Sequence, residues 1–242
     1  MTPKRRYLTL FFALGWLLAI GVAFQFGLAT AVGAAYRRAA SRLEWISQRA
    51  SDAEGAALAR VRAGSRSEYL APMRPTLDSV KALKNPNRML VGAYDGGFPN
   101  DMSGFVSLET KLRYRFPIIS FYTAWGDKPD QQFPVRMVET IDRLGSVPMI
   151  TWEPWVTDFD VRLRPNLPSK EEREYASLAA IAKGEYDFYI SPWAEAAARF
   201  GKPIFLRFAH EMNDPYRYPW GPQNGNRPDD FIGAWRRVHD IF

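Results

Sequence analysis

The sequence predicts an α/β fold with a parallel sheet, of the barrel type. Short apolar strands alternate with helical segments from residue 88 onward, which is the pattern of parallel β/α units. Polar and aromatic residues gather directly after each strand, where α/β barrels carry their active sites. The loop Asp95-Gly96-Gly97-Phe98 lacks the glycine spacing of a dinucleotide-binding turn, which disfavours the alternative of a doubly wound open sheet.

Four strand-and-helix repeats account for residues 88–242. Each predicted strand is a short apolar run that stops at polar or aromatic residues, and each predicted helix has apolar residues at helical spacing. The last helix also has Asp229 and Asp230 in its first turn, where acidic side chains suit the helix dipole. In chain order the predicted strands are 89–94, 117–122, 147–151 and 203–208, and the predicted helices are 105–115, 135–144, 170–183, 191–200 and 228–242.

The N-terminal segment 1–36 is predicted to be a signal-anchor helix. Residues 7–36 contain no charged side chain, and a helix of that length exceeds the roughly 20 residues that span a bilayer. We therefore expect a single-pass protein of the cell membrane whose folded part lies outside the cytoplasm. The alternative is a cleaved signal peptide and secretion, because 29–31 and 32–34 are runs of small residues that a peptidase can use.

Residues 37–87 are predicted to form a charged helical stalk or linker. They are rich in Ala, Arg, Ser and Glu, and Pro72, Pro75 and Pro86 punctuate the entry to the folded domain 88–242.

The net charge of +6 belongs to the N-terminus rather than to the folded part. Beyond residue 50 the basic and acidic side chains balance, so we predict no nucleic-acid partner. The charged residues of the first 50 positions are Lys4, Arg5, Arg6, Arg37, Arg38, Arg42, Arg49 and Glu44.

The absence of cysteine excludes disulfides, thiolate catalysis and cysteine-based zinc sites. Of the two histidines, His210 lacks a second histidine four residues on, because Asp214 occupies that position, so the zinc-protease spacing is missing. We predict neither a metal nor a cofactor.

The strongest candidate for chemistry is Glu211. It follows an apolar run that ends in a His-Glu pair, with Asn213 two residues later, and a carboxylate delivered to the end of a strand can act as a general acid/base. Arg207, four residues earlier, and His210 can tune its pKa and fix its rotamer. The alternative is a rim carboxylate held in a structural ion pair with Arg207.

An aromatic set surrounds this carboxylate in the predicted loops. Each ring falls after a strand beside Pro or Gly, so it can stack on a sugar face, although burial in the core is the alternative. Asp95 and Glu153 can hydrogen-bond sugar hydroxyls or orient Glu211, or they are solvated loop charges. The candidate sugar-binding aromatic residues are Trp152, Trp155, Tyr218 and Trp220, with Trp125 a weaker member.

Taken together, these motifs resemble glycoside hydrolase family 26, which includes endo-β-mannanases and mixed-linkage β-glucanases. The match is tight over residues 180–242 and looser back to residue 88. The motif Trp152-Glu-Pro-Trp155 favours the glucanase side of that family over the mannanase side. The motifs that carry the resemblance are Ile181-Ala-Lys-Gly-Glu-Tyr-Asp187, Ile190, Trp193-Ala194, Gly201-Lys-Pro203, Arg207, His210-Glu-Met-Asn213, Tyr218-Pro-Trp220 and residues 235–242.

The resemblance implies a (β/α)8 TIM barrel, of which this sequence holds about the first four β/α units. It implies hydrolysis of O-glycosidic bonds in a β-linked polysaccharide, β-mannan or β-glucan, by a retaining mechanism with two glutamates. Glu211 would be the acid/base at the end of the fourth strand, His210 would line the subsite where the bond is cleaved, and Trp220 would help to hold the sugar.

The second glutamate that the resemblance implies, the nucleophile, follows the seventh strand and is expected beyond the end of this chain. A retaining enzyme needs that carboxylate roughly 5–5.5 Å from the acid. Within this sequence Glu153 is a candidate for the role only through the proximity of strand ends, not through a motif. Two alternatives remain open. The chain can be an inactive carbohydrate-binding or scaffold protein of the envelope polysaccharide machinery. It can also be a half-barrel that pairs with another copy or a partner, because half a barrel exposes sheet edges and an apolar face.

Overall fold

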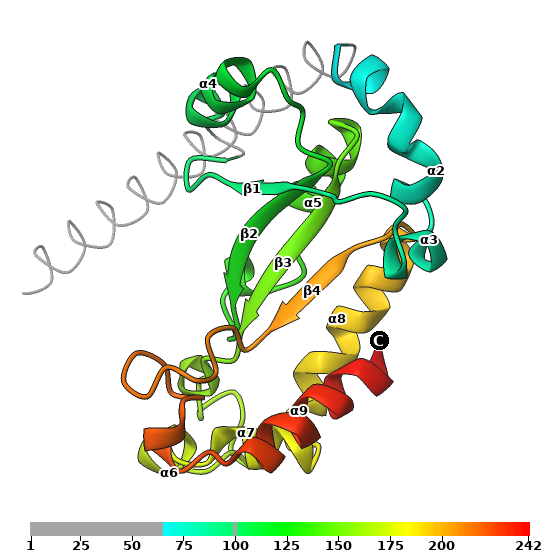
Figure 1. Ribbon diagram of the computed structural model, residues 1–242. Helices are drawn as coiled ribbons and strands as arrows, with labels where there is room; N and C mark the ends of the chain where they lie inside the picture. Colours follow the sequence, from blue (N-terminus) through cyan, green and yellow to red (C-terminus); the bar gives the residue numbers. More distant parts are fainter. Residues whose placement is uncertain (1–64, 99–100) are drawn as a thin grey trace, which may run out of the picture. The chain divides into compact units, whose positions relative to one another are not determined.

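The computed structural model describes residues 65–98 and 101–242, all of which belong to one compact unit (Figure 1). The expected membrane segment 1–36 lies outside the described residues. Among the described residues, no helix has the length and apolar character needed to cross a membrane. The strands are β1 Gly92–Tyr94, β2 Ile118–Ala124, β3 Val147–Glu153 and β4 Phe205–Phe208.

Helices follow each strand, and further short helices precede β1. The α-helices are α2 Arg74–Leu77, α3 Val80–Lys84, α4 Ser103–Leu112, α5 Val135–Arg143, α6 Lys170–Glu174, α7 Ser177–Ala182, α8 Asp187–Phe200 and α9 Pro228–Ile241. The 3-10 helices are η1 Ala71–Met73, η2 Pro129–Gln131, η3 Val156–Asp158 and η4 Pro222–Asn224.

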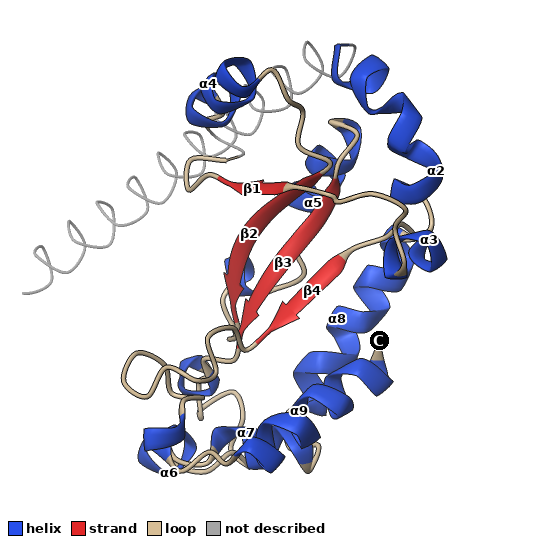
Figure 2. Ribbon diagram, in the orientation of Figure 1, coloured by secondary structure: helices blue, strands red, loops and turns tan. Residues whose placement is uncertain are grey.

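The four strands form one parallel sheet in the order β1-β2-β3-β4 (Figure 2), which confirms the predicted parallel α/β class. Spatial order therefore follows chain order. In a doubly wound sheet the strand order reverses near the first strand. The order β1-β2-β3-β4 has no such reversal, which favours part of a β/α barrel over a doubly wound sheet. The register pairs Tyr122 with Thr151 and Thr151 with Arg207, which places these side chains on one face of the sheet.

The two faces of the sheet differ in burial. One face carries Ile119, Phe121, Ile150 and Trp152, all buried in the core with side chains from α4, α5, α8 and α9. The other face carries Tyr94 and Tyr122, which are 57% and 42% exposed, together with exposed Arg207. Doubly wound sheets are covered on both faces. Here α2 and α3 contact the second face only where the strands begin, at Val147 and Phe205. A face left open over the rest of its length is consistent with a segment of a barrel wall.

Two helical predictions needed correction. The helix expected over 170–183 is divided into α6 and α7, because Ala176 adopts a left-handed conformation (φ 51°) and donates its N–H to the Asn224 carbonyl at 2.8 Å. The helix expected from residue 191 begins at Asp187, so Pro192 lies inside α8. Proline there removes one helical hydrogen bond, and the burial of Tyr189, Ile190 and Trp193 on the same helix outweighs that loss.

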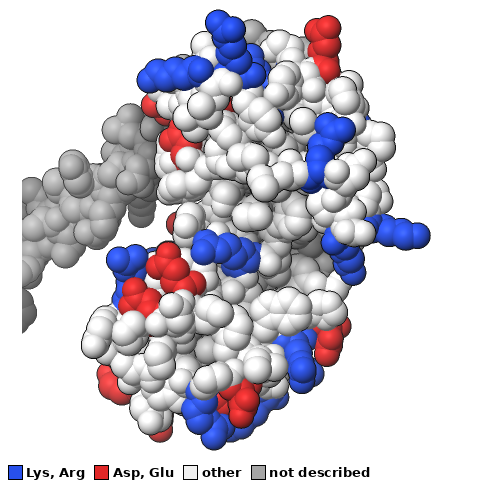
Figure 3. Space-filling view, in the orientation of Figure 1, with Lys and Arg blue, Asp and Glu red and all other residues white. Residues whose placement is uncertain are grey.

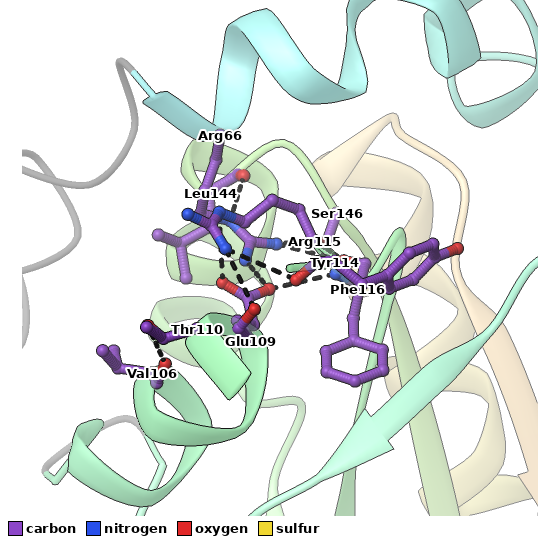
Figure 4. A network of polar contacts seen from close by, with 9 residues as sticks. All are labelled: Arg66, Val106, Glu109, Thr110, Tyr114, Arg115, Phe116, Leu144 and Ser146. Carbon is purple, nitrogen blue, oxygen red and sulfur yellow. Dashed lines mark hydrogen bonds and ion pairs between the residues drawn. The ribbon is translucent and has the colours of Figure 1, made fainter. Parts of the chain in front are cut away.

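Residues 65–84, which the sequence assigned to the stalk 37–87, pack against the sheet domain. Leu70 and Leu77 are at most 1% exposed, and Arg66 is equally buried. The Arg66 guanidinium forms an ion pair with Glu109 of α4 and donates to the Phe116 carbonyl before β2 and to the hydroxyl of Ser146 before β3 (Figure 4). This part of the segment is therefore integral to the domain.

Charged side chains of both signs are interspersed over the visible face of the described residues (Figure 3). Several form local pairs, such as Lys202 with Asp142 at 2.6 Å and Arg164 with Asp127 at 2.8 Å. The second pair ties the loop after β3 to the loop after β2, which steadies the edge of the sheet where the strands end.

Candidate functional site

The carboxyl ends of β2, β3 and β4 meet at one edge of the sheet, and the loops that follow them gather there (Figure 1). The ladder continues one residue past β4, because the Ala209 N–H donates to the Trp152 carbonyl at 3.1 Å. The chain then turns sharply at His210 and Glu211. This edge is where the sequence predicted the site.

The turn is built from two residues in the left-handed region. Ala209 has φ 46° and Glu211 has φ 52°, so they bracket His210, and neither is glycine. Such a conformation costs about 1–2 kcal/mol for a residue with a side chain, and it is concentrated at functional sites in proteins generally. As a consequence, the two side chains of the His-Glu pair point in different directions. The His210 side chain is 1% exposed, whereas the Glu211 side chain is 45% exposed.

His210 is surrounded by groups from three strand ends. Its Nε2 lies 3.0 Å from the Tyr218 hydroxyl and 3.8 Å from a carboxylate oxygen of Glu153, and its ring meets the Tyr122 ring edge-on at 5.4 Å. Burial lowers the pKa of His210, and the positive charge of Arg207 lowers it further. The imidazole is therefore held towards its neutral form.

Glu153 ends β3 and is the second carboxylate of this cluster. Its side chain is 17% exposed, and burial raises its pKa above the usual glutamate value. The sequence made Glu153 a candidate for the second catalytic carboxylate only through the proximity of strand ends, and that role stays a prediction. In the structure its carboxylate lies 3.8 Å from the Nε2 atom of His210.

Glu211 forms its ion pair with Arg217 at 3.3 Å, and Arg217 also lies 4.0 Å from Asp214. The alternative offered by the sequence, a structural ion pair between Glu211 and Arg207, was wrong. Arg207 lies on the open face of β4, and its charge acts on His210. The reason is the left-handed turn at Glu211, which directs the carboxylate into the loop after β4 rather than back along the strand.

Tyr218 and Trp220 form the wall behind His210. Their rings stack at 4.7 Å with an interplanar angle of 8°, and Trp155 meets Trp220 edge-on at 5.3 Å. The indole N–H of Trp220 donates to the His210 carbonyl at 2.7 Å, and the Trp220 ring is only 1% exposed. Trp220 thus holds the turn, and its burial corrects its assignment as a sugar-stacking residue. Trp155 and Tyr218 keep part of their surface exposed.

Trp152 and Trp125 belong to the core, which corrects their assignment as sugar-stacking residues. Both are fully buried, and their rings lie 4.6 Å apart on the helix-covered side of the sheet. A ring without exposed surface has no face to offer to a sugar. The alternation of side chains along β3 explains why Trp152 is buried while Glu153 reaches the site: the two residues are neighbours in the strand, so their side chains point to opposite faces of the sheet.

Asp95 and Asn213 are not brought into the His210 cluster by any contact of the described residues. Asp95 accepts a hydrogen bond from the Gly97 N–H at 3.0 Å, and its other oxygen packs so closely on Gly104 that a Cβ there would lie 2.7 Å away. Its carboxylate thus shapes the turn between β1 and α4. Asn213 is exposed on the loop after β4.

A hollow of about 580 Å³ adjoins this edge, between β4 and α9. Arg207, His210 and Glu211 line it from one side, and Phe231 and Trp235 from the other. Among the described residues there is no group of three His, Asp or Glu side chains that could hold a metal ion.

Sequence reasoning missed two residues of the site, Tyr122 and Arg217. Tyr122 could have been found from strand alternation, because it shares a face with Arg207 through the register of β2, β3 and β4. Arg217 had no periodic signal, since it sits in an irregular loop whose path depends on the turn at Glu211.

Fold and site together define a parallel α/β protein whose strand ends carry two carboxylates, a buried histidine and partly exposed aromatic rings. No protein-family model matches the chain. The chain is similar to a protein of Acetivibrio thermocellus named Endoglucanase H, with 29% identity over 168 residues. The matched region is 68% of this chain and 16% of that protein, so the chain spans a small part of its relative.

Proposed function

We propose that this chain contributes the acid/base side of an active site that hydrolyses a β-linked polysaccharide, with β-glucan as the preferred substrate class and β-mannan as the second. The observation that carries the proposal is the placement of Glu211, exposed at the end of β4 on a left-handed turn and backed by His210, Tyr218 and Trp220. The similarity to a protein named as an endoglucanase supports the same class.

In this proposal Glu211 protonates the glycosidic oxygen as the bond breaks and then deprotonates the incoming water. Arg217, at 3.3 Å, holds the carboxylate in place. Trp155 and Tyr218 offer partly exposed rings for stacking against the sugar. The family resemblance supports a retaining mechanism on a (β/α)8 barrel, whose second glutamate would follow a seventh strand and therefore lie outside these four β/α units.

The test compares the complete gene product with a Glu211→Gln variant for release of reducing ends from barley β-glucan and from β-mannan. We expect the variant to lose at least about 100-fold of the activity, the lower end for removal of a general acid. The control is Glu195→Gln, which removes an equally charged but 70%-exposed side chain on α8. Equal activity of Glu211→Gln and wild type would refute the assignment.

A second candidate is a carbohydrate-binding protein without hydrolytic activity, working with envelope polysaccharide machinery. The specific observation in its favour is the ion pair between Glu211 and Arg217 at 3.3 Å, which fixes an exposed carboxylate where it can accept hydrogen bonds from sugar hydroxyls. Binding of β-glucan oligosaccharides in calorimetry, with no release of reducing ends by the complete gene product, would select this candidate.

The cellular location also remains a proposal. We propose that residues 1–36 anchor the protein in the cell membrane and that the site lies outside the cytoplasm, where polysaccharide is accessible. A phosphatase reporter fused after residue 60 should be active and should sediment with membranes. A soluble, N-terminally shortened product would indicate cleavage and secretion instead.

A further inference from the structure

The side chains of Glu153, His210 and Tyr218 form a contact chain across two strand ends. The His210 Nε2 atom faces both partners, at 3.8 Å from Glu153 and 3.0 Å from the Tyr218 hydroxyl. The other ring nitrogen, Nδ1, is buried and has no hydrogen-bond partner within the described residues. All polar contacts of this imidazole therefore converge on one nitrogen.

This asymmetry decides where a neutral imidazole carries its proton. With the proton on Nδ1, a buried N–H would have no acceptor, and Nε2 would present a lone pair towards the Glu153 carboxylate. With the proton on Nε2, the N–H donates to the Tyr218 hydroxyl at 3.0 Å, the Glu153 carboxylate 3.8 Å away faces a hydrogen rather than a lone pair, and only an acceptor remains unpaired at Nδ1. Unpaired buried donors are the rarer case in proteins, which favours the second arrangement.

The position of this proton controls the Tyr218 hydroxyl. When Nε2 carries the proton, the hydroxyl oxygen accepts from it, and the phenolic hydrogen is free to donate elsewhere. When Nε2 is bare, the phenolic hydrogen is used to bond the imidazole. The hydroxyl can thus donate to a ligand only in the first case.

We propose that Glu153 is a positioning residue that holds the His210 imidazole in its Nε2–H form and thereby turns the Tyr218 hydroxyl into a hydrogen-bond donor for the ligand. The consequence for the ligand, donation to a sugar hydroxyl or ring oxygen, rests on the proposed function. The Nε2–H form of the imidazole does not rest on the proposed function, so the assignment of the imidazole and the proposed function can fail separately.

Other charged or titratable groups also face this imidazole. Tyr122 packs on the ring from β2. Arg207 on β4 and Arg217 in the following loop disfavour a positive imidazole, while Glu211 favours one. Within the described residues, none of these three side chains contacts a ring nitrogen of His210. Glu153 and Tyr218 are the groups that contact a single nitrogen.

The experiment uses long-range proton–nitrogen correlation spectra of the full chain in detergent micelles at pH 8, where the imidazole is neutral. The chain has two histidines, so a His239→Gln variant assigns both signals. Glu153→Leu removes the carboxylate, and Glu153→Gln keeps its shape but replaces the charge with an amide that can also donate. Amide proton–nitrogen spectra of each variant check the fold.

We expect the Nε2–H form to dominate in the wild type by roughly tenfold or more, which corresponds to about 1.4 kcal/mol. Glu153→Leu should reduce that ratio at least threefold, and Glu153→Gln, which also lacks the negative charge, should reduce it as well. A wild type in the Nδ1–H form, or an unchanged ratio in Glu153→Leu, would overturn the proposal. If Glu153→Leu does not fold, the tautomer ratio of Glu153→Gln decides, and an unchanged ratio there overturns the proposal.

A binding measurement then tests the consequence for the ligand. For β-glucan oligosaccharides, Tyr218→Phe and Glu153→Leu should weaken binding by a similar factor, and the double variant should be no weaker than either single one. Independent, additive losses would contradict action through a shared hydroxyl, even where the spectra support the Nε2–H form.

Discussion

The buried ion pair between Arg66 and Glu109 offers a quantitative test of whether the segment before β1 belongs to the folded domain. Both side chains are 2% exposed. Arg66 also donates to the Leu144 carbonyl at 2.9 Å, the Phe116 carbonyl at 3.0 Å and the Ser146 hydroxyl at 2.6 Å. The Arg66 side chain thus connects the segment before η1 to α4 and to the residues that precede β2 and β3.

The magnitude follows from what each substitution leaves unpaired. Arg66→Met leaves the Glu109 carboxylate buried with the Phe116 N–H at 3.0 Å and Arg115 at 3.8 Å, so we expect the lower end of the usual cost, about 3 kcal/mol. Glu109→Met leaves the guanidinium with three neutral acceptors and should also cost about 3 kcal/mol. The double variant removes both charges and should cost well below the sum, with a coupling of about 2–3 kcal/mol.

The assay is urea unfolding of the full chain in detergent, followed by tryptophan fluorescence. The control is Arg162→Met, whose guanidinium pairs with Asp160 at the surface and is 87% exposed, so its midpoint should not move. If Arg66→Met unfolded at the same urea concentration as this control, residues 65–84 would not be part of the cooperative unit. Additive single costs would instead show that the pair does not act as a unit.

Two further predictions concern the site. Trp152→Ala should lower the free energy of unfolding by about 3–5 kcal/mol, because it empties a fully buried position. Trp155→Ala should lower it less and should weaken oligosaccharide binding in calorimetry. The reverse pattern would restore Trp152 as a ligand-binding residue. Burial holds the pKa of His210 below its unfolded value of about 6.5, so just below that pH the unfolded chain binds more protons than the folded chain. The free energy of unfolding should therefore decrease as the pH drops from about 6.5 towards the lowered pKa, by at most about 1.4 kcal/mol per pH unit. His210→Gln should flatten that part of a urea-midpoint profile, and an unchanged slope would place the titration elsewhere.

The fold was largely predictable because strand and helix patterns are local. The predicted strand 147–151 lies within β3, and the predicted helix 135–144 is α5 to within one residue. The errors arose where tertiary contacts overrode local preference. Ala176 leaves the helix to bond Asn224, and Pro192 stays within one because its neighbours are buried.

The site was predictable at the level of position but not of partners. The end of β4 identified His210 and Glu211, because a polar pair that follows an apolar strand must lie at the sheet edge. Which charge pairs with Glu211 depended on a loop with no period, so Arg217 was missed. The sequence could not distinguish the core residue Trp152 from the partly exposed Trp155, because it does not show which face of β3 the helices cover.

The alternation along β3 and the turn after β4 together explain why the two carboxylates differ. Glu153 is the last residue of a strand whose preceding side chain, Trp152, is directed into the helix-covered core, so Glu153 must face the open side beneath the loop after β4. There it meets His210 and becomes buried enough for its pKa to rise. Glu211 escapes that environment only because its left-handed backbone directs its side chain outward to Arg217. With an extended backbone at position 211, the carboxylate would not be directed outward to Arg217, and the different exposures of the two carboxylates would be lost.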